Sequence, residues 1–176
     1  MPYRRRIFAA SLALLCAAAC GFAFAKEESK TPPQIGRFIR ITLPNTGQTF
    51  ERTRRIVRRA MDKAKKEDVR LVLIFVFDVP KGQKNFGRGS EFGAAHDLAN
   101  FLSSEELNAV RTVAYLPEPI QGHAVLVALA CQEIMMAPKA SIGAAGIDEK
   151  TITPTLRSAY TEIANRRRTV PTVLTL

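Results

Sequence analysis

The residues that could carry covalent chemistry gather around one turn near the middle of the chain. Gly122 and His123 end this turn and lead into an apolar run at 124–131. A histidine can take up a proton as a general base. Acyl transfer also needs a hydroxyl or thiol nucleophile within reach of that base, and residues 117–130 contain no Ser, Thr or Cys. We therefore expect His123 to be a partly buried or solvent-facing histidine at a helix start.

Lys150, Ser141 and Cys131 offer weaker chemistry. A lysine can activate a hydroxyl only when burial keeps it neutral, and the adjacent carboxylates of Asp148 and Glu149 favour its charged form. We therefore interpret Lys150 as a solvated loop residue. Ser141 lies in a turn of small residues. Cys131 closes the apolar run and is typical of a small core side chain.

The sequence predicts neither a metal nor another cofactor. No set of His, Cys, Asp and Glu has the spacing of metal ligands. His96 and Asp97 are adjacent on a predicted helix, so their side chains diverge by about 100° and share no face. The glycine-containing stretch GRGSEFG at 87–93 lacks both the lysine and the spacing of a phosphate-binding loop.

The first 25 residues have the pattern of a secretory signal peptide. Three arginines at 4–6 precede an apolar stretch at 7–25, and Ala-Phe-Ala at 23–25 supplies a small-x-small cleavage pattern. An uncleaved membrane anchor remains an alternative for residues 1–25. We therefore predict an exported protein that is periplasmic or membrane-associated. Cys131 is the one cysteine after this leader, which excludes an intramolecular disulfide in the mature chain.

The chain is strongly basic, with a formal net charge of +10. Much of the excess lies at 52–70, with a second cluster at 166–168. Nucleic acid is not the expected partner, because the protein is predicted to be exported and its basic residues have no interleaved aromatic platform. An anionic membrane surface, an acidic partner and a merely solvated helix face all remain open.

Hydrophobic periodicity predicts an α/β domain at 37–168, preceded by a polar linker at 26–36. The continuous apolar run at 71–79 is typical of a strand buried on both faces of a parallel sheet. Residues 169–176 are predicted to begin a C-terminal extension that is truncated or missing. The expected strands lie at 38–43, 71–79, 110–116 and 133–137, and the expected helices at 50–64, 90–102, 124–131 and 155–168.

Three segments, in this order and spacing, resemble the core of the Clp-protease/crotonase superfamily. They are IFVFDVPKG at 74–82, VLVALA at 125–130 and MAPKASIGA at 136–144. The resemblance covers residues 38–168 and is closest to the NfeD-type, membrane-associated serine proteases of the Clp class. It implies stacked β-α units with a mainly parallel sheet flanked by helices, and subunits that assemble into a homo-oligomer.

The resemblance also assigns roles to residues. It implies an oxyanion loop at Lys81 and Gly82, where the family pattern D-T-P-G-G is replaced by D-V-P-K-G. It implies a nucleophilic serine at the position of Gly122 and a basic lysine near Lys150. Ser141 stands in the turn that shapes the family's pocket, together with Gly143.

Taken together, these features predict a protease-like domain whose nucleophile is missing. Such a pseudoprotease would bind a peptide, a membrane-protein segment or another partner in the inherited groove. Two alternatives remain: an active membrane-associated serine endopeptidase of the Clp class, and a crotonase-like enzyme acting on a thioester. Whether the chain is an enzyme stays open at this point.

Overall fold

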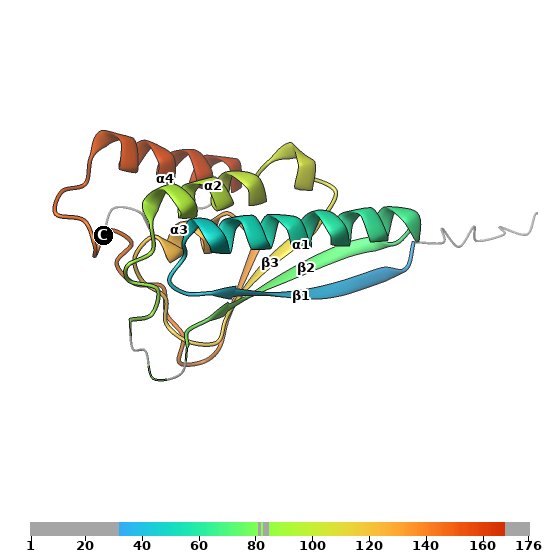
Figure 1. Cartoon of the computed structure of the whole chain (residues 1–176), viewed down its shortest axis with the longest axis horizontal. Coiled ribbons are helices and arrows are strands. Elements are labelled where there is room, and N and C mark those ends of the chain that lie inside the picture. The colour runs from blue at the N-terminus through green and yellow to red at the C-terminus, as the bar shows by residue number, and fades with distance from the viewer. Residues whose placement is uncertain (1–31, 81, 83–84, 168–176) are drawn as a thin grey trace, which may run out of the picture. The chain divides into compact units, whose positions relative to one another are not determined.

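Four parallel strands form the sheet of this protein, and their order in space is their order along the chain (Figure 1). The computed structural model describes residues 32–80, 82 and 85–167, which belong to one compact unit. This architecture confirms the predicted α/β class with a parallel sheet flanked by helices. The strands are β1 (Gln34–Thr42), β2 (Arg70–Asp78), β3 (Arg111–Leu116) and β4 (Glu133–Met136).

The helices of the described residues occupy the four predicted regions. They are α1 (Gly47–Lys66), α2 (Phe92–Leu102), α3 (Ala124–Leu129) and α4 (Pro154–Arg167), with a short 3₁₀ helix η1 (Glu105–Leu107) between α2 and β3. The predicted signal peptide, residues 26–31 of the predicted linker, Lys81 and the C-terminal residues 168–176 lie outside the described residues. Among the residues that are described, no helix is both long and apolar enough to cross a membrane.

β1 begins at Gln34, inside the stretch predicted as a linker and four residues before the predicted strand. Nine residues of β1 pair in parallel register with nine residues of β2, from Gln34 opposite Arg70 to Thr42 opposite Asp78. The polar composition of the first residues concealed this strand. Backbone pairing with a strongly apolar neighbour holds it in the sheet.

β2 is fully buried on one face only, so the prediction of burial on both faces is wrong. Leu73, Phe75 and Phe77 are 0% exposed, whereas Ile74 and Val76 between them are partly exposed. The described helices lie on one side of the sheet (Figure 1), and the buried side chains of Leu73, Phe75 and Phe77 belong to the core on that side. A half-exposed strand is usually recognised by alternating apolar and polar residues. Because β2 is apolar on both faces, this alternation is missing from its sequence.

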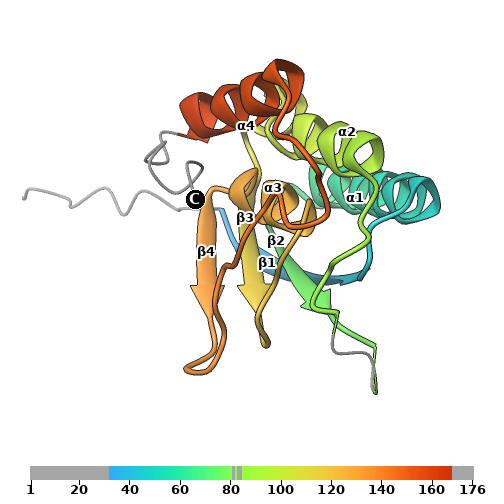
Figure 2. The same cartoon turned by 90° about the vertical axis from the view of Figure 1, so that its left-hand side faces the viewer.

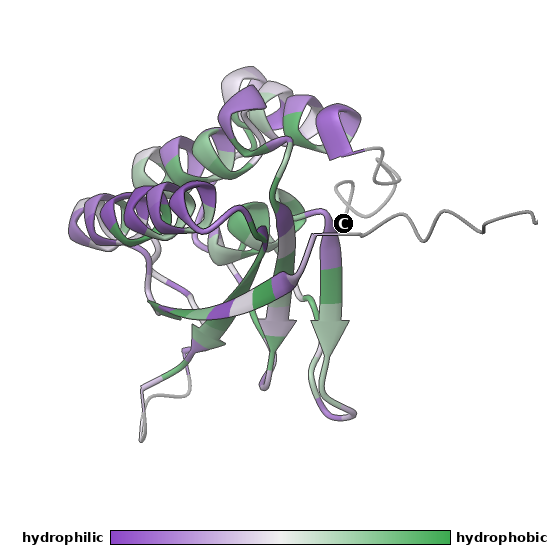
Figure 3. Cartoon of the chain, turned by 90° about the vertical axis from the view of Figure 1, so that its right-hand side faces the viewer, coloured by the Kyte–Doolittle hydropathy of each residue, from purple (hydrophilic) through white to green (hydrophobic). Residues whose placement is uncertain are grey.

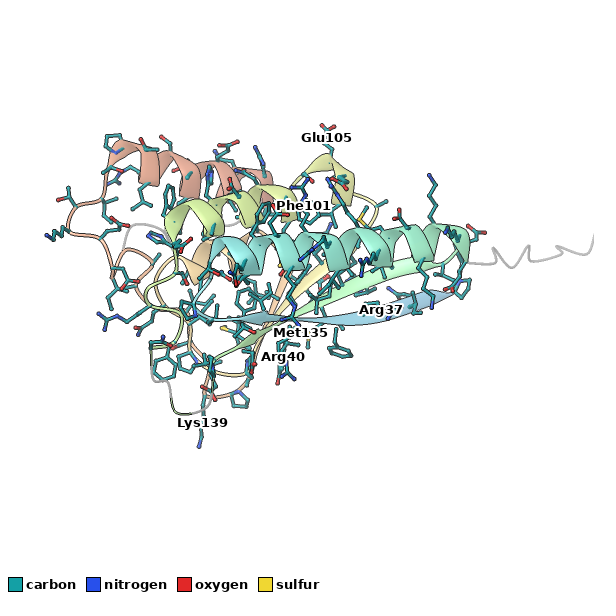
Figure 4. All side chains as sticks on the ribbon, in the orientation of Figure 1. Arg37, Arg40, Phe101, Glu105, Met135 and Lys139 are labelled. Atoms are coloured by element: carbon teal, nitrogen blue, oxygen red, sulfur yellow. The ribbon has the colours of Figure 1, made fainter. Side chains whose placement is uncertain are left out.

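The second face of the sheet carries exposed apolar and charged side chains. Phe38 is 75% exposed and Met135 is 58% exposed. Arg40 and Met135 belong to one row across the sheet, through Val76 and Tyr115, and both point away from the helices (Figure 4). None of the described residues covers this face.

The core lies between the sheet and the helices, and α3 is at its centre. Every residue from Ala124 to Leu129 is buried, in keeping with the apolar character of this run. α2 and α4 both pack against α3. α1 is amphipathic: Val57 and Ala64 face the core, while its arginines and lysines form the hydrophilic outer surface visible in Figure 3.

Candidate functional site

Three loops meet at the carboxyl ends of the strands (Figure 2). They follow β2, β3 and β4 and comprise residues 79–91, 117–123 and 137–153. Parallel strands deliver all their following loops to the same edge of the sheet, and ligand sites of α/β proteins lie at this edge. The sheet topology therefore brings together the loops that carry the predicted site residues.

Backbone hydrogen bonds join the loop after β3 to both of the others. The Gln121 N–H donates to the carbonyl of Phe86, with an N···O distance of 2.7 Å. The Ile120 N–H donates to Ser141 at 2.9 Å, and the Gly143 N–H donates back to Ile120 at 2.8 Å. The turn that contains Ser141 and Gly143 thus lies directly beside the turn that leads into α3.

Gly122 occupies a position that disfavours any side chain. Its φ is +63°, in the left-handed region that glycine adopts readily and other residues do not. A Cβ at this position would lie 2.7 Å from Oδ2 of Asp148 and 3.3 Å from the carbonyl oxygen of Gly87. The position at which the resemblance places a serine is therefore shaped for glycine.

The carboxylate of Asp148 fills the space beside Gly122. Oδ2 accepts a hydrogen bond from the Gly89 N–H at 2.7 Å, and Oδ1 lies 3.6 Å from Nε of Arg88. A charge-assisted bond to a backbone N–H is stronger than a neutral one. This carboxylate is thus fixed to the glycine-rich loop, and it places negative charge next to the turn.

The predicted oxyanion loop is described only in part. Lys81 lies outside the described residues, whereas Gly82 is exposed and has a φ of +86°. Nothing lies within 4 Å of a Cβ built on Gly82. Gly89, farther along the same loop, already donates its N–H to Asp148.

His123 is buried and both of its ring nitrogens have partners, so the expected partly buried or solvent-facing position is wrong. The residue is 1% exposed, because α3 begins beneath α2 and α4. Nε2 lies 2.9 Å from Oε1 of Glu149, and Nδ1 lies 3.3 Å from the hydroxyl of Tyr160. The ring of Phe92 contacts the imidazole edge to face, with centroids 5.2 Å apart.

Tyr160, the partner of Nδ1, is also buried. Burial raises the pKa of the Tyr160 phenol well above its ordinary value, and the negative charge of Glu149 adds to the shift. The phenol therefore stays protonated at neutral pH. With Tyr160 on Nδ1 and Glu149 on Nε2, both imidazole nitrogens are engaged and neither is left for a substrate.

Sequence reasoning did not find this network. Glu149 is 26 residues from His123 and Tyr160 is 37 residues away. No local spacing signals a contact over such separations. The one sign in the sequence is the helical spacing that places Tyr160 on the same side of its helix as Leu156, Ile163 and Ala164.

Lys150 and Ser141 are both exposed, which confirms the interpretation of Lys150 as a solvated loop residue. Within the described part of the chain, Lys150 makes no ion pair and no side-chain hydrogen bond to a hydroxyl. The described residues therefore do not pair Lys150 with a hydroxyl, as a Ser/Lys site would require.

Cys131 is 3% exposed, which confirms its interpretation as a core side chain. Burial raises the pKa of its thiol to about 12. The thiolate, which is the nucleophilic form, is then scarce at neutral pH. Among the residues described, no group of three or more His, Cys, Asp and Glu could hold a metal ion.

No protein-family model, curated protein or solved structure matches this chain. The parallel α/β fold therefore stands on the structure itself. The likeness to Clp-class proteases remains a prediction that depends on the three quoted segments.

Proposed function

We propose that this chain is an exported, Clp-class serine-protease-like domain that lacks its nucleophile and binds a peptide or partner segment instead of cleaving it. The observation that carries this proposal is the turn at Gly122. Its left-handed backbone strains any side chain, and a Cβ there would lie 2.7 Å from the carboxylate of Asp148, which would have to shift to admit a serine. The absence of a hydroxyl thus coincides with surroundings that favour glycine at this position.

The surroundings of His123 support the same function. Its two ring nitrogens hydrogen-bond to Glu149 and Tyr160. The residue therefore holds two elements against α3, namely α4 and the loop that follows β4. A general base needs a nitrogen facing a substrate proton. His123 instead acts as a positioning residue for the turn and for the loop that carries Asp148.

The two alternative functions fit these contacts less well. An active endopeptidase of the Ser/Lys type requires a lysine beside a hydroxyl, but Lys150 is exposed and has no such contact among the described residues. A crotonase-like enzyme requires free backbone N–H groups for a thioester oxyanion. The carboxylate of Asp148, which lies beside the Gly122 turn, would repel an oxyanion that develops there.

The test is labelling of the full chain with a fluorophosphonate probe, together with hydrolysis of an unstructured peptide. The wild-type chain is expected to show neither. Labelling of the wild type that disappears in Lys150→Ala would establish an active protease and overturn the proposal. Because Gly122→Ser places Cβ against Asp148, the serine must be introduced together with Asp148→Ala, with Asp148→Ala alone as the matched control.

A further inference from the structure

A groove lies between α1 and the free edge of the sheet. It is an open hollow of about 340 Å³, lined by Arg37 and Phe38 from β1 and by Ile56, Arg59, Ala60 and Lys63 from α1. We call it the β1–α1 groove. It lies on different elements from the Gly122 turn.

The floor of the β1–α1 groove combines apolar surface with backbone that has no strand partner. β1 is the first strand in the sheet order, and β2 is its one neighbour among the described strands. The other edge of β1 therefore presents N–H and C=O groups to which an extended chain can add. Phe38 is 75% exposed and Ile56 is 38% exposed, so an added strand would also bury apolar side chains.

The charged residues that line the groove are all basic. Arg37 and Arg59 form no ion pair with any residue that the structure describes, and both are exposed. Lys63 contacts Glu67 at 3.6 Å, in an exposed pair. None of the described residues that line the groove is acidic. Exposed pairs contribute little, so three positive groups are available to a ligand.

The positive charge of the groove helps to decide between three possible occupants: a second copy of the chain, a bilayer surface and an extended peptide. A second copy of the chain would place Arg37 and Arg59 against like charges, which disfavours pairing of two β1 edges. A bilayer surface could meet the arginines, but it offers no backbone to the edge of β1 inside the hollow. An extended peptide with carboxylates satisfies both the charges and the strand edge.

We propose that an extended acidic peptide segment binds in the β1–α1 groove as an added strand beside β1. Its carboxylates face Arg37, Arg59 and Lys63 on the helix side of the sheet, and an apolar side chain of the added strand packs on Phe38 on the opposite face. The proposal rests on the partner-binding function proposed above, and it assigns that function to a surface outside the inherited site. The partner chemistry is an exposed acidic strand or tail of another protein.

The test is fluorescence anisotropy of the full chain with a labelled peptide of about eight residues, a length typical of one strand, in which glutamate alternates with valine. We expect saturable binding that weakens as salt rises. Arg37→Glu with Arg59→Glu should bind about tenfold more weakly, because two attractive charges become repulsive. The matched control is Arg52→Glu with Arg55→Glu, which makes the same charge change elsewhere on α1 and should bind nearly as the wild type does.

A second probe separates strand addition from charge alone. The same peptide with alternate backbone nitrogens methylated keeps its carboxylates but loses its hydrogen-bond donors, and we expect its binding to be lost. Equal binding of the methylated peptide, or equal weakening by both pairs of substitutions, would overturn the proposal. Vesicles of phosphatidylserine give a further outcome that would overturn the proposal. If Arg37→Glu with Arg59→Glu abolishes binding to these vesicles but leaves peptide binding unchanged, the surface is a membrane contact.

The two proposals can fail separately. If the wild type binds the peptide and the Arg37 and Arg59 substitutions have no effect, the groove is wrong and partner binding stands. If the wild type cleaves the peptide, the proposed function is wrong, whatever the groove does. A dimer that is lost in the Arg37 and Arg59 variant would assign the groove to a second copy and overturn its acidic occupant.

Discussion

At the scale of single residues, the turn before α3 depends on groups that lie far away in sequence. Asp148 reaches back to the N–H of Gly89, and Glu149 reaches back to His123. The adjacent residues Asp148 and Glu149 thus bind two different loops, the one after β2 and the one after β3. The turn therefore owes its shape to the loop after β4 as much as to its own glycine.

The hydroxyl of Tyr160 gives the first prediction. Tyr160→Phe removes the hydrogen-bond partner of Nδ1 of buried His123, and leaving such a group unsatisfied costs about 1–3 kcal/mol. Urea unfolding at neutral pH measures this loss. Tyr115→Phe, on the outer face of the sheet, is a matched control that should change the free energy of unfolding little.

The pH dependence of stability follows from the same phenol. The pKa of Tyr160 is raised in the folded protein, so its contribution is complete below about pH 10, the ordinary tyrosine pKa, and is lost as the pH rises above it. The buried thiol of Cys131, with its pKa raised to about 12, adds a loss that begins near its lower unfolded value. The Tyr160→Phe variant should therefore lose less stability between neutral pH and pH 11. An equally steep loss in both proteins would contradict the network.

At the scale of elements, the sequence specified which segments form strands and helices but not how the sheet is covered. The segments at 71–79 and 124–131 were assigned correctly because their apolar runs are long and bounded by turns. The exposure of β2 was missed because Ile74 and Val76 are as apolar as their buried neighbours. The contacts at Gly122 were missed because they depend on φ and on a carboxylate that is distant in sequence.

Two adjacent residues of β2 test the one-sided core. Leu73→Ala removes a fully buried side chain and should cost about 2–5 kcal/mol of unfolding free energy. Ile74→Ala removes a partly exposed side chain from the other face and should cost clearly less. Thermal or urea denaturation of both variants gives the comparison. Equal losses would mean that the outer face is covered in the native protein, as in the homo-oligomer that the family resemblance implies.

At the scale of the whole molecule, the charge is unevenly spread. The formal net charge is +10, and the outer surface of α1 is strongly hydrophilic with many basic residues (Figure 3). The loops at the carboxyl ends of the strands instead place Asp148 beside Gly122. Acidic ligands should therefore be drawn toward α1 and β1 and away from the Gly122 turn.

The central claim is that this chain binds a peptide without cleaving it. The most direct measurement is prolonged incubation of an excess of the labelled acidic peptide with the full chain, followed by mass spectrometry of the peptide and anisotropy of the mixture. The account predicts a bound fraction and full recovery of the intact peptide. Fragments that accumulate over many turnovers, and that are absent when Lys150→Ala replaces the wild type, would contradict it.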